Sequence, residues 1–190
     1  SNIESSIRTS ITSAYRLGYN KIIITHVDAI NIIRQIVEDN LLGFEITKEY
    51  PNGCEISNIT EPSEEQFDNI FNKEIMNINE LFKTAKQINE NEKIDYYYIE
   101  NKIIQFDNFC RRVVIKNKRN KNYELEWSFY TAINRGQREI FHLVKFIEKN
   151  KIKNIKEIIE LINQTNNVFE MLIEAYKNKD LKILEKIHEM

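Results

Sequence analysis

The sequence predicts a mainly α-helical protein with a small α+β part at its N-terminus. Glycine (4) and proline (2) are scarce among the 190 residues, which favours long, uninterrupted elements over many tight turns. After residue 62, apolar residues recur at steps of three and four through several successive segments, which is the spacing of one helix face. We therefore divide the chain into a small α/β segment, 1–62, and a helical bundle, 63–190.

The first segment predicts the element order αβαββ. Residues 3 to 17 form an amphipathic helix that Gly18 ends, because glycine accepts the left-handed backbone of a helix C-terminus. The β-branched run Lys21–Thr25 predicts a strand. Asp28 is a suitable N-cap for a second helix that follows it.

The segment ends in a predicted β-hairpin over residues 43 to 60. Phe44 and Ile46 alternate with polar residues, as expected for a half-buried strand. The turn Tyr50–Gly53 contains a proline, which fixes φ, and a glycine, which accepts a positive φ. So few strands are not stable alone, so we expect another part of the chain to pack against them.

The second segment predicts an antiparallel bundle with coiled-coil-like packing. Ser63 and Gln66 form a capping box for its first helix, and Asn154 with Glu157 caps its fourth. Short breaks near 89–92, 118–121 and 150–153 separate the helices. The four apolar seams are Phe71, Ile75, Ile78, Phe82 and Ala85; Ile99, Ile103, Phe106, Cys110 and Val113; Phe129, Ile133, Gly136, Ile140, Leu143 and Ile147; and Ile155, Ile158, Ile162, Phe169, Leu172 and Tyr176.

A fifth apolar helix begins near the end of the sequence. Asn178–Asp180 reads as a turn, and Leu181, Leu184 and Ile187 then follow at helical spacing before the sequence stops at Met190. We expect either a shortened chain or a partner that completes the bundle.

Composition excludes several classes of function. A net charge of −2 gives no general electrostatic case for nucleic acid or an anionic membrane. Cys54 and Cys110 lie in different predicted elements and do not make a disulfide framework, so we expect a reducing, cytoplasmic location. No apolar run approaches the roughly 20 residues of a membrane span, so we expect no membrane insertion.

Catalysis finds little support in the motifs. There is no Gly-rich phosphate loop, no Cys-x-x-Cys and no Gly-x-Ser-x-Gly. His26, His142 and His188 fall in different elements without a partner pattern. We therefore expect a protein that is not an enzyme and acts by binding.

Three segments carry a resemblance to a known family. They are Ala14–Asn20, which precedes the isoleucine strand; Leu41–Ile46, which is similar to that family's "LIGLEI" strand; and Asn58–Ser63, which resembles its "D-x-x-D-P-S-E" approach to the first bundle helix. In order and spacing the chain resembles the archaeal PhoU-domain regulators of phosphate uptake over nearly its whole length. It looks like a truncated or short member, with one three-helix repeat, the start of a second, and no counterpart of the AbrB-like domain.

The resemblance implies a PhoU-like fold and a regulator of phosphate uptake that binds other proteins. The expected partners are a phosphate transporter, a sensor kinase or another regulator, together with a second copy of the chain as a homodimer. An interaction module that kept the fold while its role changed is a further alternative, since fold alone does not fix function.

PhoU bundles also hold metal clusters on acidic helix motifs, and here the matching segments are degraded. Ile103–Asp107 keeps only Asp107 of the acidic run, and Arg138–His142 places Glu139 and His142 three apart on one helix face. These three side chains are the candidate ligands for iron or zinc. The simpler interpretation, an ordinary surface Glu and a half-buried His, is the one we favour, and we expect no cofactor.

Two further patterns have a functional and a structural interpretation. A basic stretch at the end of the second bundle helix could contact phosphate groups or DNA. Cations also suit a helix C-terminus, and we do not expect nucleic acid as a partner of this chain alone. Tyr96–Tyr98 could stack a ligand, but neighbours on a helix point about 100° apart, so one or two packing rings are expected. The basic stretch comprises Arg111, Arg112, Lys116, Lys118, Arg119 and Lys121.

Overall fold

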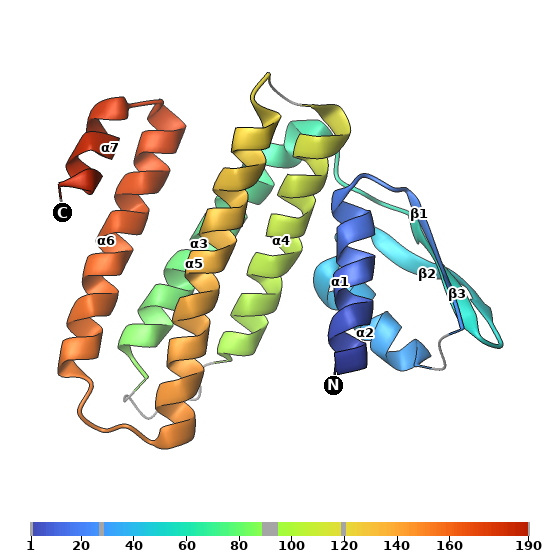
Figure 1. The fold of residues 1–190 in the computed structure, drawn as a ribbon, viewed down its shortest axis with the longest axis horizontal. Helices are drawn as coiled ribbons and strands as arrows, with labels where there is room; N and C mark the ends of the chain where they lie inside the picture. Colours follow the sequence, from blue (N-terminus) through green and yellow to red (C-terminus); the bar gives the residue numbers. More distant parts are fainter. Residues whose placement is uncertain (1, 27–28, 89–94, 119–120, 190) are drawn as a thin grey trace. The chain divides into compact units, whose positions relative to one another are not determined.

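The structure is a computed structural model that describes residues 2–26, 29–88, 95–118 and 121–189. This part of the chain is mainly helical and contains a three-stranded antiparallel sheet (Figure 1). The chain divides into two compact units. Unit 1 comprises residues 1–78 and 97–137, and unit 2 comprises 79–96 and 138–190. The boundary predicted after residue 62 lies inside unit 1.

The predicted order αβαββ is confirmed in unit 1. The elements are α1 (Asn2–Arg16), β1 (Lys21–Thr25), α2 (Ile30–Asn40), β2 (Phe44–Tyr50) and β3 (Gly53–Asn58). The strands lie in the order β1-β3-β2, and both pairings are antiparallel. Gly18 follows α1 with φ +90°, the left-handed conformation expected of a helix-ending glycine. The predicted cap residue Asp28 lies outside the described residues.

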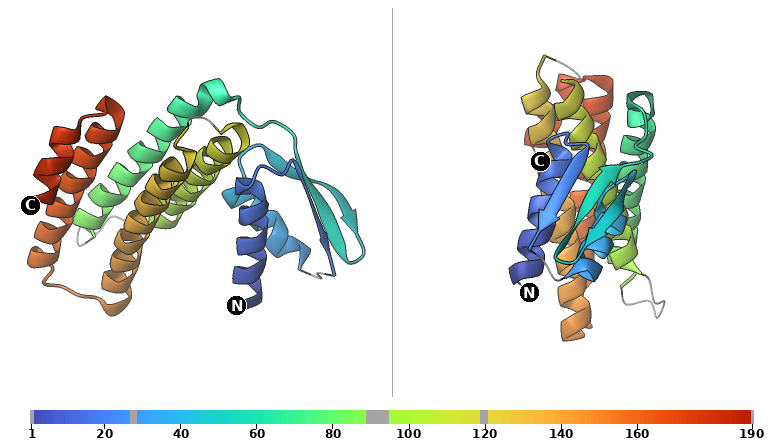
Figure 2. Two further views of the ribbon diagram at one scale, coloured as in Figure 1. Left: turned by 45° about the horizontal axis from the view of Figure 1, so that its top comes forward. Right: turned by 90° about the vertical axis from the view of Figure 1, so that its right-hand side faces the viewer.

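Helices α1 and α2 pack on one face of the sheet (Figures 1 and 2). The register places Ile22 opposite Ile56, and Ile46 opposite Ile56 on the other side, so these side chains share that face. Ile56, Tyr15 of α1 and Ile33 of α2 are fully buried there. The hairpin and the lone strand thus gain the packing that so few strands require.

The bundle helices are α3 (Phe67–Lys86), α4 (Tyr96–Asn117) and α5 (Tyr123–Asn150), and successive helices alternate in direction (Figure 1). The predicted capping box is wrong. A 3₁₀ turn, Glu64–Gln66, precedes α3, and Ser63 makes no side-chain capping bond. The Gln66 N–H instead donates to the Ser63 backbone carbonyl at 3.0 Å, so the backbone itself satisfies the donor that the box would have capped.

The predicted apolar seams agree with the structure best on α3, where all five residues are buried. On α4 the seam is buried except for half-buried Phe106. On α5 the assignment of Gly136 is wrong, because Gly136 is exposed and Gln137 is buried in its place. A polar residue at a core position is invisible to a search for apolar spacing.

Unit 2 contains the second halves of α3 and α5 with α6 (Lys156–Asn178) and α7 (Leu181–His188). Rings of Phe82 and Phe169 lie 5.7 Å apart and join α3 to α6. The predicted cap at Asn154 is wrong: Ile155, which is buried, occupies the N-cap and makes no side-chain bond. The helix predicted at Leu181 is confirmed, and the Asp180 carboxylate caps it by accepting from the Lys182 N–H at 2.9 Å.

None of the described helices has a stretch both long and apolar enough to cross a lipid bilayer.

Candidate functional site: a polar stripe on helix α4

A row of polar side chains runs along the face of α4 that meets the α/β part of unit 1. Its members are spaced by three and four residues, so they lie on one side of the helix. We call this row the α4 stripe. It consists of Gln105, Asn108, Arg112 and Lys116, and each member bonds to residues before α3.

Arg112 is the centre of the α4 stripe and is fully buried. Its Nε donates to Glu61 Oε1 at 2.7 Å, and one terminal nitrogen donates to Glu61 Oε2 at 3.1 Å and to Asn20 Oδ1 at 2.6 Å. The other terminal nitrogen donates to the backbone carbonyls of Tyr15 at 2.8 Å and Tyr19 at 2.9 Å. A guanidinium has five N–H donors, and all five are used.

Two aromatic rings also contact the Arg112 guanidinium. Its central carbon lies 4.9 Å from the ring centroid of Tyr15 and 4.9 Å from that of Phe44. The two rings meet edge to face, with centroids 4.9 Å apart. Cation–π contacts of this kind are stronger when the cation is desolvated, as it is here.

Glu61 completes the charge balance of the site. Its side chain is 9% exposed and also lies 3.3 Å from the Lys116 ammonium. Burial on its own would raise the pKa of Glu61, but Arg112 and Lys116 outweigh it and hold the pKa below the ordinary value. The carboxylate therefore stays ionised at neutral pH and pairs with two cations of the α4 stripe.

The remaining members of the α4 stripe contact the end of α2. The Asn108 amide donates to the Asn40 carbonyl at 2.9 Å, and its oxygen accepts from Arg16 Nε at 2.7 Å. The Gln105 amide donates to the Glu38 carbonyl at 3.0 Å. Carbonyls at a helix C-terminus have no partner within the helix, so these amides satisfy acceptors that would otherwise be left open.

The three segments that carry the family resemblance converge on Arg112. Tyr15, Tyr19 and Asn20 belong to the first, Phe44 to the second, and Glu61 to the third.

The glycine of the second segment also contacts the third segment directly. The Gly43 carbonyl accepts from the Ile59 N–H at 2.8 Å and from the Thr60 N–H at 3.1 Å. Gly43 has φ +79°, and a Cβ there would lie 2.4 Å from the Glu61 Cα. Only glycine fits this backbone conformation and this close approach, so position 43 requires a residue without a Cβ.

A second buried polar group lies on another face of α4. Glu74 of α3 and Asp107 are both fully buried, and Arg111 is 6% exposed. Arg111 Nε donates to Asp107 Oδ1 at 2.9 Å, and its terminal nitrogens donate to Thr131 Oγ1 and to the Tyr130 carbonyl of α5. Among the described residues, neither Glu74 oxygen has an N–H or O–H donor within hydrogen-bonding distance.

This buried pair of carboxyls is arranged to hold a proton on Glu74. Burial raises the pKa of Glu74 well above its usual range, and the Asp107 charge adds to that effect. Burial also raises the pKa of Asp107, but Arg111 and Arg16 oppose the shift. Asp107 directly contacts the cations of Arg111 and Arg16, so the ionised form is favoured at Asp107 and the protonated form at Glu74.

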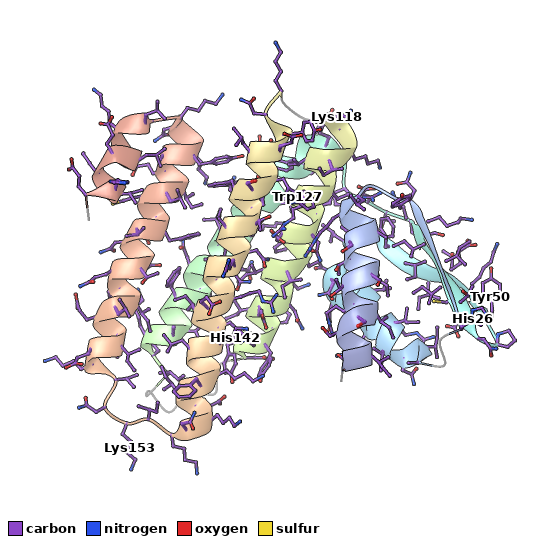
Figure 3. The ribbon with its side chains drawn as sticks, in the orientation of Figure 1. His26, Tyr50, Lys118, Trp127, His142 and Lys153 are labelled. Atoms are coloured by element: carbon purple, nitrogen blue, oxygen red, sulfur yellow. The ribbon has the colours of Figure 1, made fainter. Side chains whose placement is uncertain are left out.

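The three candidate metal ligands have different surroundings. Asp107 is buried in unit 1 and already faces the guanidinium of Arg111, whereas Glu139 and His142 are exposed residues of α5 in unit 2. Figure 3 labels His142 on α5. Within the described ranges, no three His, Cys, Asp or Glu side chains come together as a metal centre requires. The described donors do not fit the implied cluster, and the metal alternative stays a prediction for metal analysis.

The basic stretch divides between interior and surface. Arg111 and Arg112 are buried, and Lys116 pairs with Glu61, so these three belong to internal contacts. Lys118, which directly follows α4, is exposed (Figure 3), and Lys121 is exposed as well. Arg119 lies outside the described residues.

The tyrosine triplet follows the expected division. Tyr96 is buried, bonds to Glu148, and packs edge to face on Phe141 with ring centroids 5.6 Å apart. Tyr97 is 46% exposed and Tyr98 is 59% exposed.

Comparison with protein-family models, with curated proteins and with solved structures finds no match to this chain. The resemblance to PhoU-domain regulators therefore depends on the sequence segments alone.

Sequence reasoning missed the roles of Asn108, Arg112 and Glu74. A usable signal was present for the α4 stripe, because Asn108, Arg112 and Lys116 repeat at a spacing of four and so share one face of the helix. No sequence signal marks Glu74, since a lone Glu beside an apolar seam is usually a surface residue.

Proposed function

We propose that this chain is a PhoU-like, non-catalytic regulator of phosphate uptake that acts by binding a protein partner. The observation that supports the proposal is the convergence of the three resembling segments on Arg112. Segments that lie far apart in the sequence share one buried arginine, as expected if their order and spacing reflect a common architecture. The partner classes are a phosphate transporter, a sensor kinase or another regulator.

The chemistry of the buried groups also favours binding over catalysis. All the N–H donors of Arg112 bond to acceptors of its own chain, and the Glu61 carboxylate pairs with two cations, Arg112 and Lys116. A catalytic arginine or carboxylate needs access to a substrate, and neither group offers it. These charges hold the α/β part against α4 and leave the exposed surfaces for a partner.

Phosphate uptake in cells of the source organism tests the proposal. Cells that lack the chain should take up labelled phosphate faster than the parent strain when phosphate is plentiful, and the wild-type chain should restore the lower rate. Sulfate uptake in the same cells is the control for a general transport defect. Unchanged phosphate uptake, or an equal change for sulfate, would contradict the proposal.

The two alternatives from the sequence have separate tests. A metal-binding bundle requires an ion that copurifies in stoichiometric amount and falls with Asp107→Asn. A DNA-associated regulator requires duplex binding with a steep salt slope that is lost when the exposed Lys118 and Lys121 are neutralised. Within the basic stretch, Arg111 and Arg112 are buried and Lys116 is already paired with Glu61, which weakens that alternative.

A further inference from the structure

The two outer strands of the sheet differ in how well they resist pairing with another chain. The β2 edge has a register shift between Ile46 and Lys48 and carries the charges of Glu45, Lys48 and Glu49. Bulges and edge charges are the usual protection of a free strand. Strand β1 pairs with β3 through five consecutive residue pairs without a register shift, so its other edge has no bulge. Lys21 is the sole charged residue of β1.

A groove of about 420 Å³ follows the unprotected edge of β1. One wall is α1, through Ser6, Ile7, Ser10 and Ile11, and the other wall is four consecutive residues of β1, from Ile22 to Thr25. Successive strand side chains point to opposite faces, so a groove that touches four in a row lies along the strand edge and not on one face. Its shape suits an extended backbone beside β1.

We propose that the occupant is the β1 strand of a second copy of this chain, which pairs antiparallel with β1 about Ile23. The pairing joins the two sheets into one of six strands, in the order β2-β3-β1-β1-β3-β2. A two-fold axis through the pair of Ile23 residues relates the copies, as in most homodimers.

The β1 sequence is complementary to itself in this arrangement. Ile22 lies opposite Ile24 of the second copy on the helix-covered face, and Ile23 meets its counterpart on the open face. Lys21 lies opposite Thr25 of the second copy, so no like charges are opposed. Ile23 is 60% exposed in the single chain, and pairing would cover it.

The α1 wall suits the same arrangement. An axis perpendicular to the sheet puts both α1 helices on one side of the joined sheet, next to the axis. Ser6 and Ser10 stand one helical turn apart in the groove, and small side chains allow two helices to approach closely. The charged side chains of Glu4 and Arg8, which pair at 3.1 Å, do not line the groove, so α1 contributes no charge to the groove wall.

Solution mass by light scattering, with dilution to determine Kd, tests the interface on the full chain. The key variant is Ile23→Lys. In a single chain the new lysine would lie opposite Glu55, which already pairs with Lys21, so the fold tolerates it. In the dimer the two introduced lysines meet at the axis, so Kd should rise at least tenfold. Leu181→Lys, at a 72% exposed position on α7, is the matched control and should leave Kd unchanged.

A crosslink tests the register. Ile23→Cys should give a covalent dimer on mild oxidation, because the two thiols meet at the axis, whereas Glu45→Cys on the opposite edge should not. The native Cys54 and Cys110 are buried and do not interfere. Far-UV circular dichroism and an unchanged Tm confirm that each variant folds.

Three results would overturn the interface: a wild-type monomer at high concentration, a dimer that Ile23→Lys leaves intact, or a dimer that Leu181→Lys disrupts. None of them bears on the proposed regulatory function, because phosphate uptake is measured separately. An unrelated apolar peptide that binds the monomer at β1 would likewise exclude the second copy as the occupant.

Discussion

Replacing Arg112 with methionine should lower the free energy of unfolding by about 3 kcal/mol, at the low end of the range for breaking a buried ion pair. Five donors are lost together. Hydrogen bonds to charged groups contribute about 1.5–3 kcal/mol each, and a simple sum over five would approach the whole stability of a domain. The guanidinium no longer has to be desolvated in the variant, and this offsets most of the sum.

What remains is the penalty of the acceptors left behind. In the Arg112→Met variant, the Glu61 carboxylate still has the Lys116 ammonium 3.3 Å away, so its charge remains paired. The backbone carbonyls of Tyr15 and Tyr19 lose their hydrogen bonds from Arg112. The expected loss of unfolding free energy is therefore several kcal/mol, although methionine packs well.

Urea unfolding followed by the fluorescence of Trp127 measures this loss. Trp127 is the sole tryptophan and lies in unit 1, with its ring centroid 5.3 Å from the Arg111 guanidinium. With a typical urea dependence of about 2 kcal/mol per M, the midpoint should fall by roughly 1.5 M. The matched control, Arg135→Met at an exposed position of α5, should change stability by less than about 0.5 kcal/mol.

The reasoning would be refuted if Arg112→Met and the exposed control lost equal stability. A double-mutant cycle with Glu61→Gln adds a second check, since residues in one network should couple by more than about 0.5 kcal/mol. The folded pKa of Glu61 is depressed, so its contribution is present above the ordinary glutamate pKa and is lost as the pH falls through the folded value. The coupling should therefore vanish in acid.

Three other predictions concern single buried sites. Burial raises the folded pKa of Glu74, so its contribution to stability is complete below the ordinary glutamate value and is lost as the pH rises through the folded value. Glu74→Gln should therefore gain stability relative to wild type as the pH rises above the ordinary glutamate value, and a relative stability that does not change between pH 4 and pH 8 would contradict this. Gly43→Ala should lose more than about 1 kcal/mol in urea unfolding, because its Cβ would lie 2.4 Å from the Glu61 Cα at φ +79°; an equally stable variant would exclude that close approach. Cys54 and Cys110 are buried, so a thiol reagent should modify both rapidly in urea and slowly in the native protein, and fast native labelling would show that they are accessible.

The sequence by itself determined the local elements and the apolar faces. The isoleucine strand, the place of the hairpin turn and the seam of α3 follow from side-chain size and a period of two or three to four residues. These properties belong to a few neighbouring residues, so no distant contact is needed to predict them. The positive φ expected of Gly53 is wrong: that glycine is needed because a Cβ there would lie 2.0 Å from the Ile24 carbonyl oxygen of the neighbouring strand.

Helix caps were less predictable, because several backbone partners compete for the same donors. Ser63 and Asn154 have suitable side chains, but a 3₁₀ turn follows the first and buried Ile155 occupies the N-cap next to the second. A backbone hydrogen bond replaces the cap before α3, and burial of Ile155 accompanies the start of α6, whereas a side-chain cap contributes only about 1 kcal/mol.

The tertiary structure alone decided what the charges do. Arg111 and Arg112 are adjacent in a basic stretch, yet one faces Asp107 and the other faces Glu61, because neighbours on a helix point about 100° apart. Whether a carboxyl is ionised, as at Glu61, or protonated, as at Glu74, depends on which cations and how much water the folded chain places beside it. Those neighbours come from segments distant in the sequence, and only folding brings them together.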